Sequence, residues 1–153
     1  MKRRSARAIA VQCLYIMEMN RVNPDIALRT AMEEALNDNE SGMDMTGADE
    51  LMVYVKEYVH DIVRLKPEID EILAKYLQGW QVDRLSKVDR EVLRLAVFEM
   101  VYKDDIPPKV AVNEAIELAK HFGTDESGKF VNGVLGKLIK QLDDIKAAAK
   151  PTQ

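Results

Sequence analysis

Apolar residues recur along almost the whole chain at the three- and four-residue spacing of an α-helix. In residues 5–19 they form one stripe, which consists of Ala6, Ile9, Ala10, Cys13, Leu14 and Met17. At 3.6 residues per turn these positions share one face of a helix. Similar stripes predict further helices at about residues 25–37, 48–65, 67–77, 86–100, 108–122 and 124–142. No stretch alternates in the manner of a β-strand. The pattern therefore predicts an all-α fold of about seven helices.

Prolines, glycines and small polar residues mark the expected ends of these helices. We expect helices to begin or break at Pro24, Pro67, Pro107 and Pro108. Capping residues are expected at Ser86, Gly79, Gly123 and Thr124. The polar, acidic segment 37–47 predicts a boundary between two packed helical subdomains, at about residues 1–45 and 46–145, within one domain spanning 1–153. The tail 146–153 is expected to fray.

The side of the first helix that faces away from its apolar stripe has an unusual composition. It carries Arg4, Arg7, Val11 and Tyr15, where a solvent-facing side normally shows scattered Lys, Glu and Gln. The four basic residues of the chain's start also crowd a helix N-terminus, where the helix dipole disfavours cations. A frayed, solvated basic start is one interpretation. The shared face of arginines and an aromatic instead favours an anion-binding surface, with nucleic acid as the first candidate.

Charge and composition restrict the class of protein. Hydrophobic residues make up 47% of the chain and charged residues 31%, which is typical of a folded, soluble protein. The net charge is −4, so a local basic patch on an acidic body fits selective binding better than general adhesion to polyanions. No apolar run is long enough for a membrane span or a signal peptide. The single cysteine, Cys13, lies on the apolar stripe and fits a reducing cytoplasm.

A search for catalytic chemistry finds little. The two histidines, His60 and His121, are far apart, and neither a metal-ligand cluster nor a phosphate-binding glycine loop is present in the sequence. We therefore expect no enzyme activity, metal or cofactor. Segment 121–130 instead places Phe122 and Phe130 near Lys129, a combination that suits stacking of unpaired RNA bases. The alternative is that both phenylalanines pack in the core.

Two glycines inside the last predicted helix, Gly133 and Gly136, would weaken that helix by up to about 1 kcal/mol each relative to alanine. Close approach of another backbone is the expected reason for their presence.

Four strings in the same order carry a family resemblance over nearly the whole chain. They are AVQCLY (residues 10–15), DREVLRLA (89–96), KVAVNEAIELAK (109–120) and KFVNGVL (129–135). With the arginine-rich start, they resemble the bacterial transcription antitermination factor family NusB. The resemblance implies a non-enzymatic, all-helical protein of the cytoplasm. Such a protein binds single-stranded boxA-type RNA of ribosomal RNA leader transcripts together with NusE, a small-subunit ribosomal protein, and joins the RNA polymerase-bound Nus factors.

The resemblance also implies roles for individual residues. Those matched to RNA binding are Lys2, Arg3, Arg4, Arg7, Phe122, Glu126, Lys129 and Phe130. Tyr15 and Asp89 match positions at the partner protein's interface, and Val11 shares the helix face of Tyr15. A different class of function stays open: a homodimeric protein–protein adaptor in which this first-helix face meets a second copy and RNA binding is weak or occluded.

Overall fold

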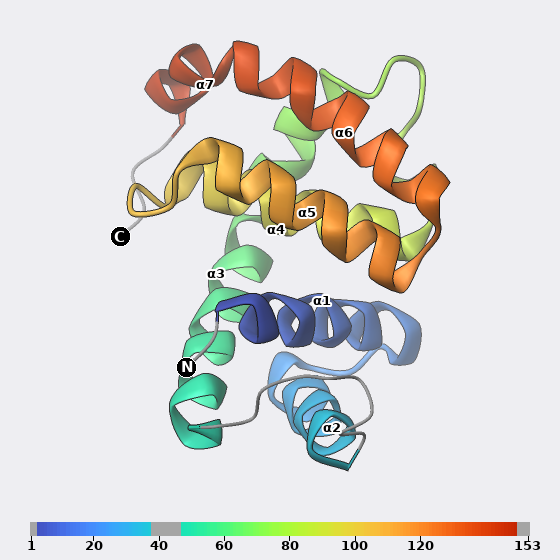
Figure 1. Cartoon of the computed structure of the whole chain (residues 1–153), viewed down its shortest axis with the longest axis vertical. Coiled ribbons are helices and arrows are strands. Elements are labelled where there is room, and N and C mark those ends of the chain that lie inside the picture. The colour runs from blue at the N-terminus through green and yellow to red at the C-terminus, as the bar shows by residue number, and fades with distance from the viewer. Residues whose placement is uncertain (1–2, 38–46, 150–153) are drawn as a thin grey trace. The chain divides into compact units, whose positions relative to one another are not determined.

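The computed structural model describes residues 3–37 and 47–149, and within these ranges the chain forms α-helices and one short 3₁₀ helix without strands (Figure 1). The all-α prediction is confirmed. Lys2 lies outside the described residues, as does most of the acidic segment 37–47.

The chain divides into two units, Met1–Arg64 and Leu65–Gln153. The division falls after Arg64, whereas the boundary predicted near residue 45 lies outside the described residues. The beginning of the third helix belongs with the second. His60 Nε2 lies 3.3 Å from Asp25 Oδ1, and Lys56 Nζ lies 3.8 Å from the same oxygen.

In the first unit, α1 (Arg3–Asn20) packs against α2 (Pro24–Asn37). The predicted stripe of α1 is buried at Ile9, Ala10 and Cys13. Helix α2 begins at Pro24 as expected, and the Asn23 side chain accepts a hydrogen bond of 3.0 Å from the Ile26 N–H. Burial of these apolar side chains holds the two helices together.

Helix α3 (Ala48–Ala74) is continuous through Pro67. The prediction of two helices separated at this proline is therefore wrong. Proline in a helix interior removes one hydrogen bond and costs about 3 kcal/mol. The apolar stripe nevertheless keeps its register across the proline, because Ile62, Leu65 and Ile69 are spaced by three and four residues and are all buried. Burial on both sides of Pro67 outweighs the local preference for a break.

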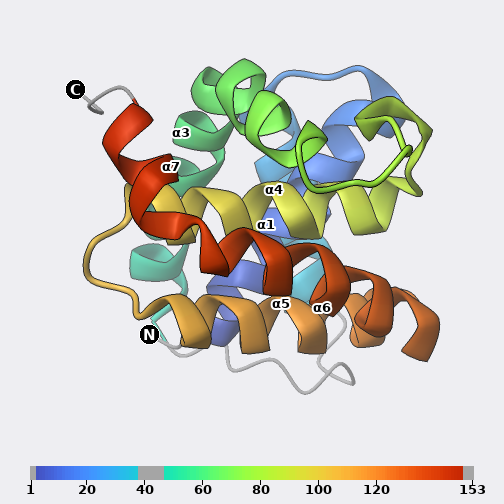
Figure 2. The same cartoon turned by 90° about the horizontal axis from the view of Figure 1, so that it is seen from above.

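In the second unit, the short η2 (Val82–Arg84) precedes α4 (Lys87–Tyr102), whose residues 90–101 are all buried. Helix α5 (Pro108–Phe122) packs against both α4 and α6 (Asp125–Lys140), as Figure 2 shows. Helix α7 (Leu142–Ala148) contacts α4. The predicted last helix thus ends at Lys140, and Gln141 separates it from α7.

The expected caps of the second unit are largely confirmed. Ser86 and Thr124 each accept a hydrogen bond from a backbone N–H three residues later, at 3.2 and 3.3 Å. Helix α5 starts at Pro108 and is followed by Gly123. Gly79 has a φ of +86°, which favours glycine, but it lies in the turn beyond the end of α3.

A buried ionic cluster joins the end of α3 to α4 in this unit. Arg94 donates two hydrogen bonds of 2.8 Å to Asp70 and two more, of 3.1 and 3.2 Å, to Glu91. Burial alone would lower the pKa of Arg94, but hydrogen bonding to Asp70 and the charges of Glu91 and Asp70 reverse the effect and raise it. The cluster therefore holds a fixed charge in the interior.

Candidate nucleic-acid interface

The start of α1 presents fewer basic side chains than the helical pattern predicts. Arg3 and Arg4 are exposed, whereas Arg7 and Val11 are only 5% and 2% exposed. The prediction that Arg7 and Val11 face solvent is therefore wrong. The prediction fails because residues 5–11 are all buried, so this stretch of α1 has no side that faces solvent.

Tyr15 lies one helical turn beyond Val11 and is half-buried. Of the first-helix residues matched to the partner interface, it is the one whose side chain is partly accessible. The accessible portion of α1 thus consists of Arg3 and Arg4 at its start, part of Gln12, and positions from Tyr15 onward.

The connection between α5 and α6 is closely packed. The Phe122 ring, half-buried at the end of α5, meets the His121 ring edge-on, with centroids 4.9 Å apart and an interplanar angle of 73°. A Cβ atom at Gly123 would lie 2.5 Å from Ser127 Oγ and 2.9 Å from the Ala119 carbonyl oxygen. Glycine is therefore needed at this connection, which fixes Phe122 relative to the first turn of α6.

The first turns of α6 carry the remaining matched residues of this region. Glu126 and Lys129 form an exposed ion pair, with 3.4 Å between Oε1 and Nζ. Phe130 is half-buried. Both Phe122 and Phe130 therefore keep part of their rings accessible, and neither is a fully buried core residue. These residues and Phe122 belong to the second unit, while Arg3 and Arg4 belong to the first.

A groove of about 230 Å³ adjoins Phe130. It is lined by Tyr76, Leu77, Gln78, Trp80, Lys129, Phe130, Gly133, Val134 and Lys137. Trp80 is 59% exposed and did not emerge from the sequence pattern as a candidate. The signal that points to it is local: a bulky aromatic directly follows Gly79 in a connection between helices, where no apolar stripe requires it.

Among the described residues, the two helical glycines of α6 do not meet the backbone of another element. Apart from the backbone of α6 itself, no described atom lies within 4 Å of a Cβ built on Gly133 or on Gly136. The prediction of close approach at these positions is wrong. Gly133 instead leaves open space in the wall of the groove.

Asp89 lies in the first turn of α4, where a carboxylate is favoured by the helix dipole. Its backbone N–H donates to Ser86 Oγ, while Oδ1 is buried and has no hydrogen-bond partner among the described residues. A buried carboxylate oxygen without a donor is costly.

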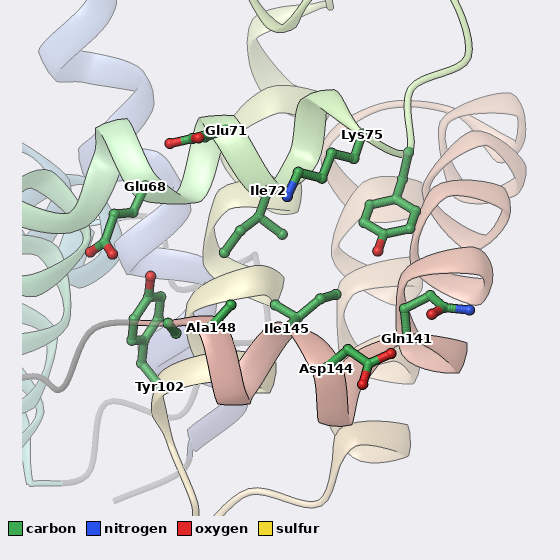
Figure 3. A pocket seen from close by; sticks show the side chains of 11 residues that line it. Glu68, Glu71, Ile72, Lys75, Tyr102, Gln141, Asp144, Ile145 and Ala148 are labelled. Atoms are coloured by element: carbon green, nitrogen blue, oxygen red, sulfur yellow. The ribbon is translucent and has the colours of Figure 1, made fainter.

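A larger cavity, of about 300 Å³, lies between the end of α3 and α7 (Figure 3). Figure 3 shows Ile72 facing Ile145 across it, with the Tyr102 hydroxyl directed toward Glu68. Burial and the negative charge of Glu68 raise the pKa of Tyr102 to about 12. Because acidic side chains outnumber Lys75 in its lining, this cavity is unsuited to phosphate.

In the ranges that the structure describes, no helix has the length and apolarity that a membrane crossing requires. Within the same ranges, no three His, Cys, Asp or Glu side chains are grouped so that they could hold a metal ion.

Relatives of the chain cover it almost from end to end. The transcription antitermination protein NusB of Bacillus subtilis (strain 168) is 40% identical over 143 residues, which are 94% of this chain and 98% of that protein. The protein of the same name from Bacillus licheniformis is 41% identical over 143 residues, covering 94% of this chain and all of the relative.

Solved structures share this fold. T. maritima NusB superposes with a TM-score of 0.78 at 34% identity and 92% coverage of each chain. A crystal structure of antitermination factors NusB and NusE in complex with dsRNA superposes with a TM-score of 0.74 at 30% identity, covering 90% of this chain and 96% of that one. The NusB family model matches residues 4–140. The chain belongs to the NusB family.

Proposed function

We propose that this protein is a transcription antitermination factor without enzymatic activity. In this proposal it binds boxA-type RNA of ribosomal RNA leader transcripts together with NusE, and the pair joins the Nus factors on RNA polymerase in the cytoplasm. The observation that carries the proposal is the match over nearly the whole chain to proteins named transcription antitermination protein NusB. A NusB of the same fold forms a complex with NusE and dsRNA.

The accessible groups of the second unit suit RNA binding. Lys129 supplies a cation for phosphate, and the half-buried rings of Phe122 and Phe130 supply faces for unpaired bases. Glu126 forms an exposed ion pair with Lys129 at the start of α6. A cation next to accessible aromatic rings is the arrangement that single-stranded RNA requires.

Arg3 and Arg4 are the described cations at the start of α1 to which we assign phosphate contacts; Lys2 shares this role in the proposal. We assign no direct RNA contact to Arg7, because its side chain is buried. The same argument removes Val11 from the partner interface.

Tyr15 and Asp89 are the residues to which we assign contact with NusE. The side chain of Asp89 is partly exposed in the first turn of α4, which supports this assignment. Truncation of Asp89 should therefore weaken NusE binding while leaving RNA binding by the isolated protein unchanged.

Fluorescence anisotropy of a labelled boxA RNA and a scrambled control, each with and without NusE, tests the proposal. We expect NusE to tighten binding of boxA and to leave the scrambled RNA weakly bound, because the partner adds its own contacts to one RNA. Equal, weak and salt-sensitive binding of both RNAs under all conditions would contradict it.

The second candidate, a homodimeric adaptor that uses the first-helix face, predicts a different result. Its mass measured by light scattering would double with concentration, and RNA would not dissociate the dimer. The burial of Arg7 and Val11 makes this face a poor self-interface.

A further inference from the structure

Trp80 is displayed at the surface by a strained turn. Gln78 and Gly79 both adopt positive φ values, of +43° and +86°, and the Trp80 N–H donates to the Leu77 carbonyl at 3.1 Å. A non-glycine residue with positive φ is uncommon, and Gln78 adopts it in the turn that precedes Trp80. The result is an indole that is 59% exposed, although a tryptophan normally buries most of its surface.

The facing wall of the groove comes from α6. Lys129, Gly133 and Lys137 follow one another at intervals of four residues, so they lie along the same side of this helix. The missing side chain at Gly133 leaves open space between the two lysines, and Phe130 lines the groove beside it. The groove thus has Trp80 on one wall and Phe130 on the other, with open space at Gly133.

Charge determines which ligand fits. The charged side chains that line this groove are Lys129 and Lys137, about 12 Å apart along the helix axis, and no acidic residue lines it. Lys129 is paired with Glu126, but both side chains are more than 70% exposed, and such a pair is weak enough to be exchanged for phosphate. Two cations on the wall that faces an exposed indole match an anionic polymer that carries flat apolar groups.

We propose that this groove binds one unpaired base of single-stranded RNA, which stacks on Trp80 opposite Phe130, while Lys129 and Lys137 hold the phosphates on either side. The open space at Gly133 admits the edge of the base. The inference rests on the proposed function, because RNA binding by the protein is its starting point. It extends the RNA path beyond the residues matched to the family, to Trp80 and Lys137.

The tryptophan itself reports on this contact, since the chain contains only one. Titration of the full chain with unlabelled boxA RNA at low salt, with excitation of the indole at its red edge, should quench Trp80 emission as binding saturates. Free N-acetyltryptophanamide with the same RNA corrects for absorption of the light. Saturable anisotropy of a labelled RNA without any change in Trp80 emission would contradict the stacking.

Variants then separate stacking from structure. Trp80→Leu keeps an apolar side chain but removes the aromatic face, and should weaken RNA binding about tenfold, whereas Trp80→Phe should retain most of that affinity.

Gly133→Leu should weaken RNA binding by filling the groove. It should not lower Tm, because leucine is a better helix former than glycine. Lys137→Gln should reduce the magnitude of the salt slope by about 0.7.

Lys140→Gln is the matched control, since this lysine is exposed on the same helix and does not line the groove. If the wild type selects boxA with NusE but all groove variants bind equally well, the groove inference fails and the proposed function stands. If RNA quenches Trp80 and the variants lose affinity without boxA selectivity, the boxA proposal fails and the groove stands. Absence of any RNA binding by the wild type overturns both.

Discussion

Arg94 carries a positive charge into the interior of the second unit, where its neighbours are carboxylates. We expect Arg94→Met to lower the free energy of unfolding by about 3–5 kcal/mol, because Glu91 and Asp70 would lose their shared partner inside the protein. Urea unfolding followed by circular dichroism measures this loss.

The matched control is Arg64→Met, which removes an arginine from an ion pair with Asp61 on α3. Both of those side chains are 45% or more exposed, so the expected change is within about 0.5 kcal/mol. Equal losses for the two variants would contradict the importance of burial for the Arg94 cluster.

Cys13 is chemically protected by its position. Burial, and to a lesser degree the charge of Asp25, raise the pKa of its thiol to about 12. Because the thiolate is the reactive form, its fraction at pH 8 is very small and grows only as the pH rises toward that pKa. We expect iodoacetamide to modify the folded protein more than roughly tenfold more slowly than the urea-unfolded chain at pH 8. Comparable rates, measured by mass spectrometry, would show that the thiol is accessible.

The contrast between Cys13 and Arg7 shows how far the burial of a single side chain can be predicted from sequence. Cys13 shares a stripe with apolar neighbours, so its burial could be predicted. Arg7 lies off that stripe, but a helical projection gives only the direction of a side chain and not what surrounds it. Because charged residues are rarely buried, the sequence alone favours an exposed Arg7.

At the scale of elements, the glycines of α6 and of the α5–α6 connection should respond in opposite ways to the same substitution. Gly136→Ala should raise stability by up to about 1 kcal/mol, because a Cβ there meets no atom within 4 Å and alanine favours the helix. Gly123→Ala should lower it by about 1–3 kcal/mol, because its Cβ would collide with Ser127 and a backbone carbonyl.

Thermal unfolding of the two alanine variants measures both effects under the same conditions. A loss of stability in Gly136→Ala would mean that space above this glycine is needed by the folded chain. An unchanged Tm in Gly123→Ala would mean that the connection relaxes without cost.

Helix starts could be predicted because their causes are local. Ser86, Thr124 and Pro108 act within a few residues of their own position, whatever the rest of the chain does. The continuity of α3 through Pro67 could not be predicted locally, because it depends on the burial of residues on both sides of the proline. The open space at Gly133 and Gly136 could not be predicted for a similar reason, because a sequence pattern does not show which atoms surround a residue.

At the scale of the whole molecule, the protein carries a net charge of −4 and is proposed to bind a polyanion. Binding must then depend on a few well-placed cations. We expect the double variant Arg3→Gln, Arg4→Gln to reduce the magnitude of the salt slope for RNA binding by about 1.4, since each phosphate contact to a single strand contributes about 0.7. Anisotropy titrations between 50 and 200 mM salt give the slope.

A double variant of equal charge change, Arg29→Gln with Lys66→Gln, controls for the altered net charge. Both of these residues are exposed and lie on α2 and α3, away from the start of α1 in the sequence. If both double variants change the slope equally, the effect is one of net charge and the assignment of Arg3 and Arg4 is incorrect.

The family could be identified from sequence because its strings on α4, α5 and α6 extend along the chain in a fixed order. The groove beside Phe130 could not be identified, because it joins a turn at residues 78–80 to a helix some fifty residues later. Only the folded second unit brings Trp80 to the side of α6 that carries Lys137.

Pro67 interrupts the hydrogen bonding of α3 at the boundary between the two units. The ring nitrogen of Pro67 carries no hydrogen, so it cannot donate the helical hydrogen bond to the carbonyl of Val63. The boundary between the two units, after Arg64, lies between these two residues. The one helix that both units share is therefore interrupted in its hydrogen bonding at their junction. An opening that begins in one unit can stop there before it spreads along the helix.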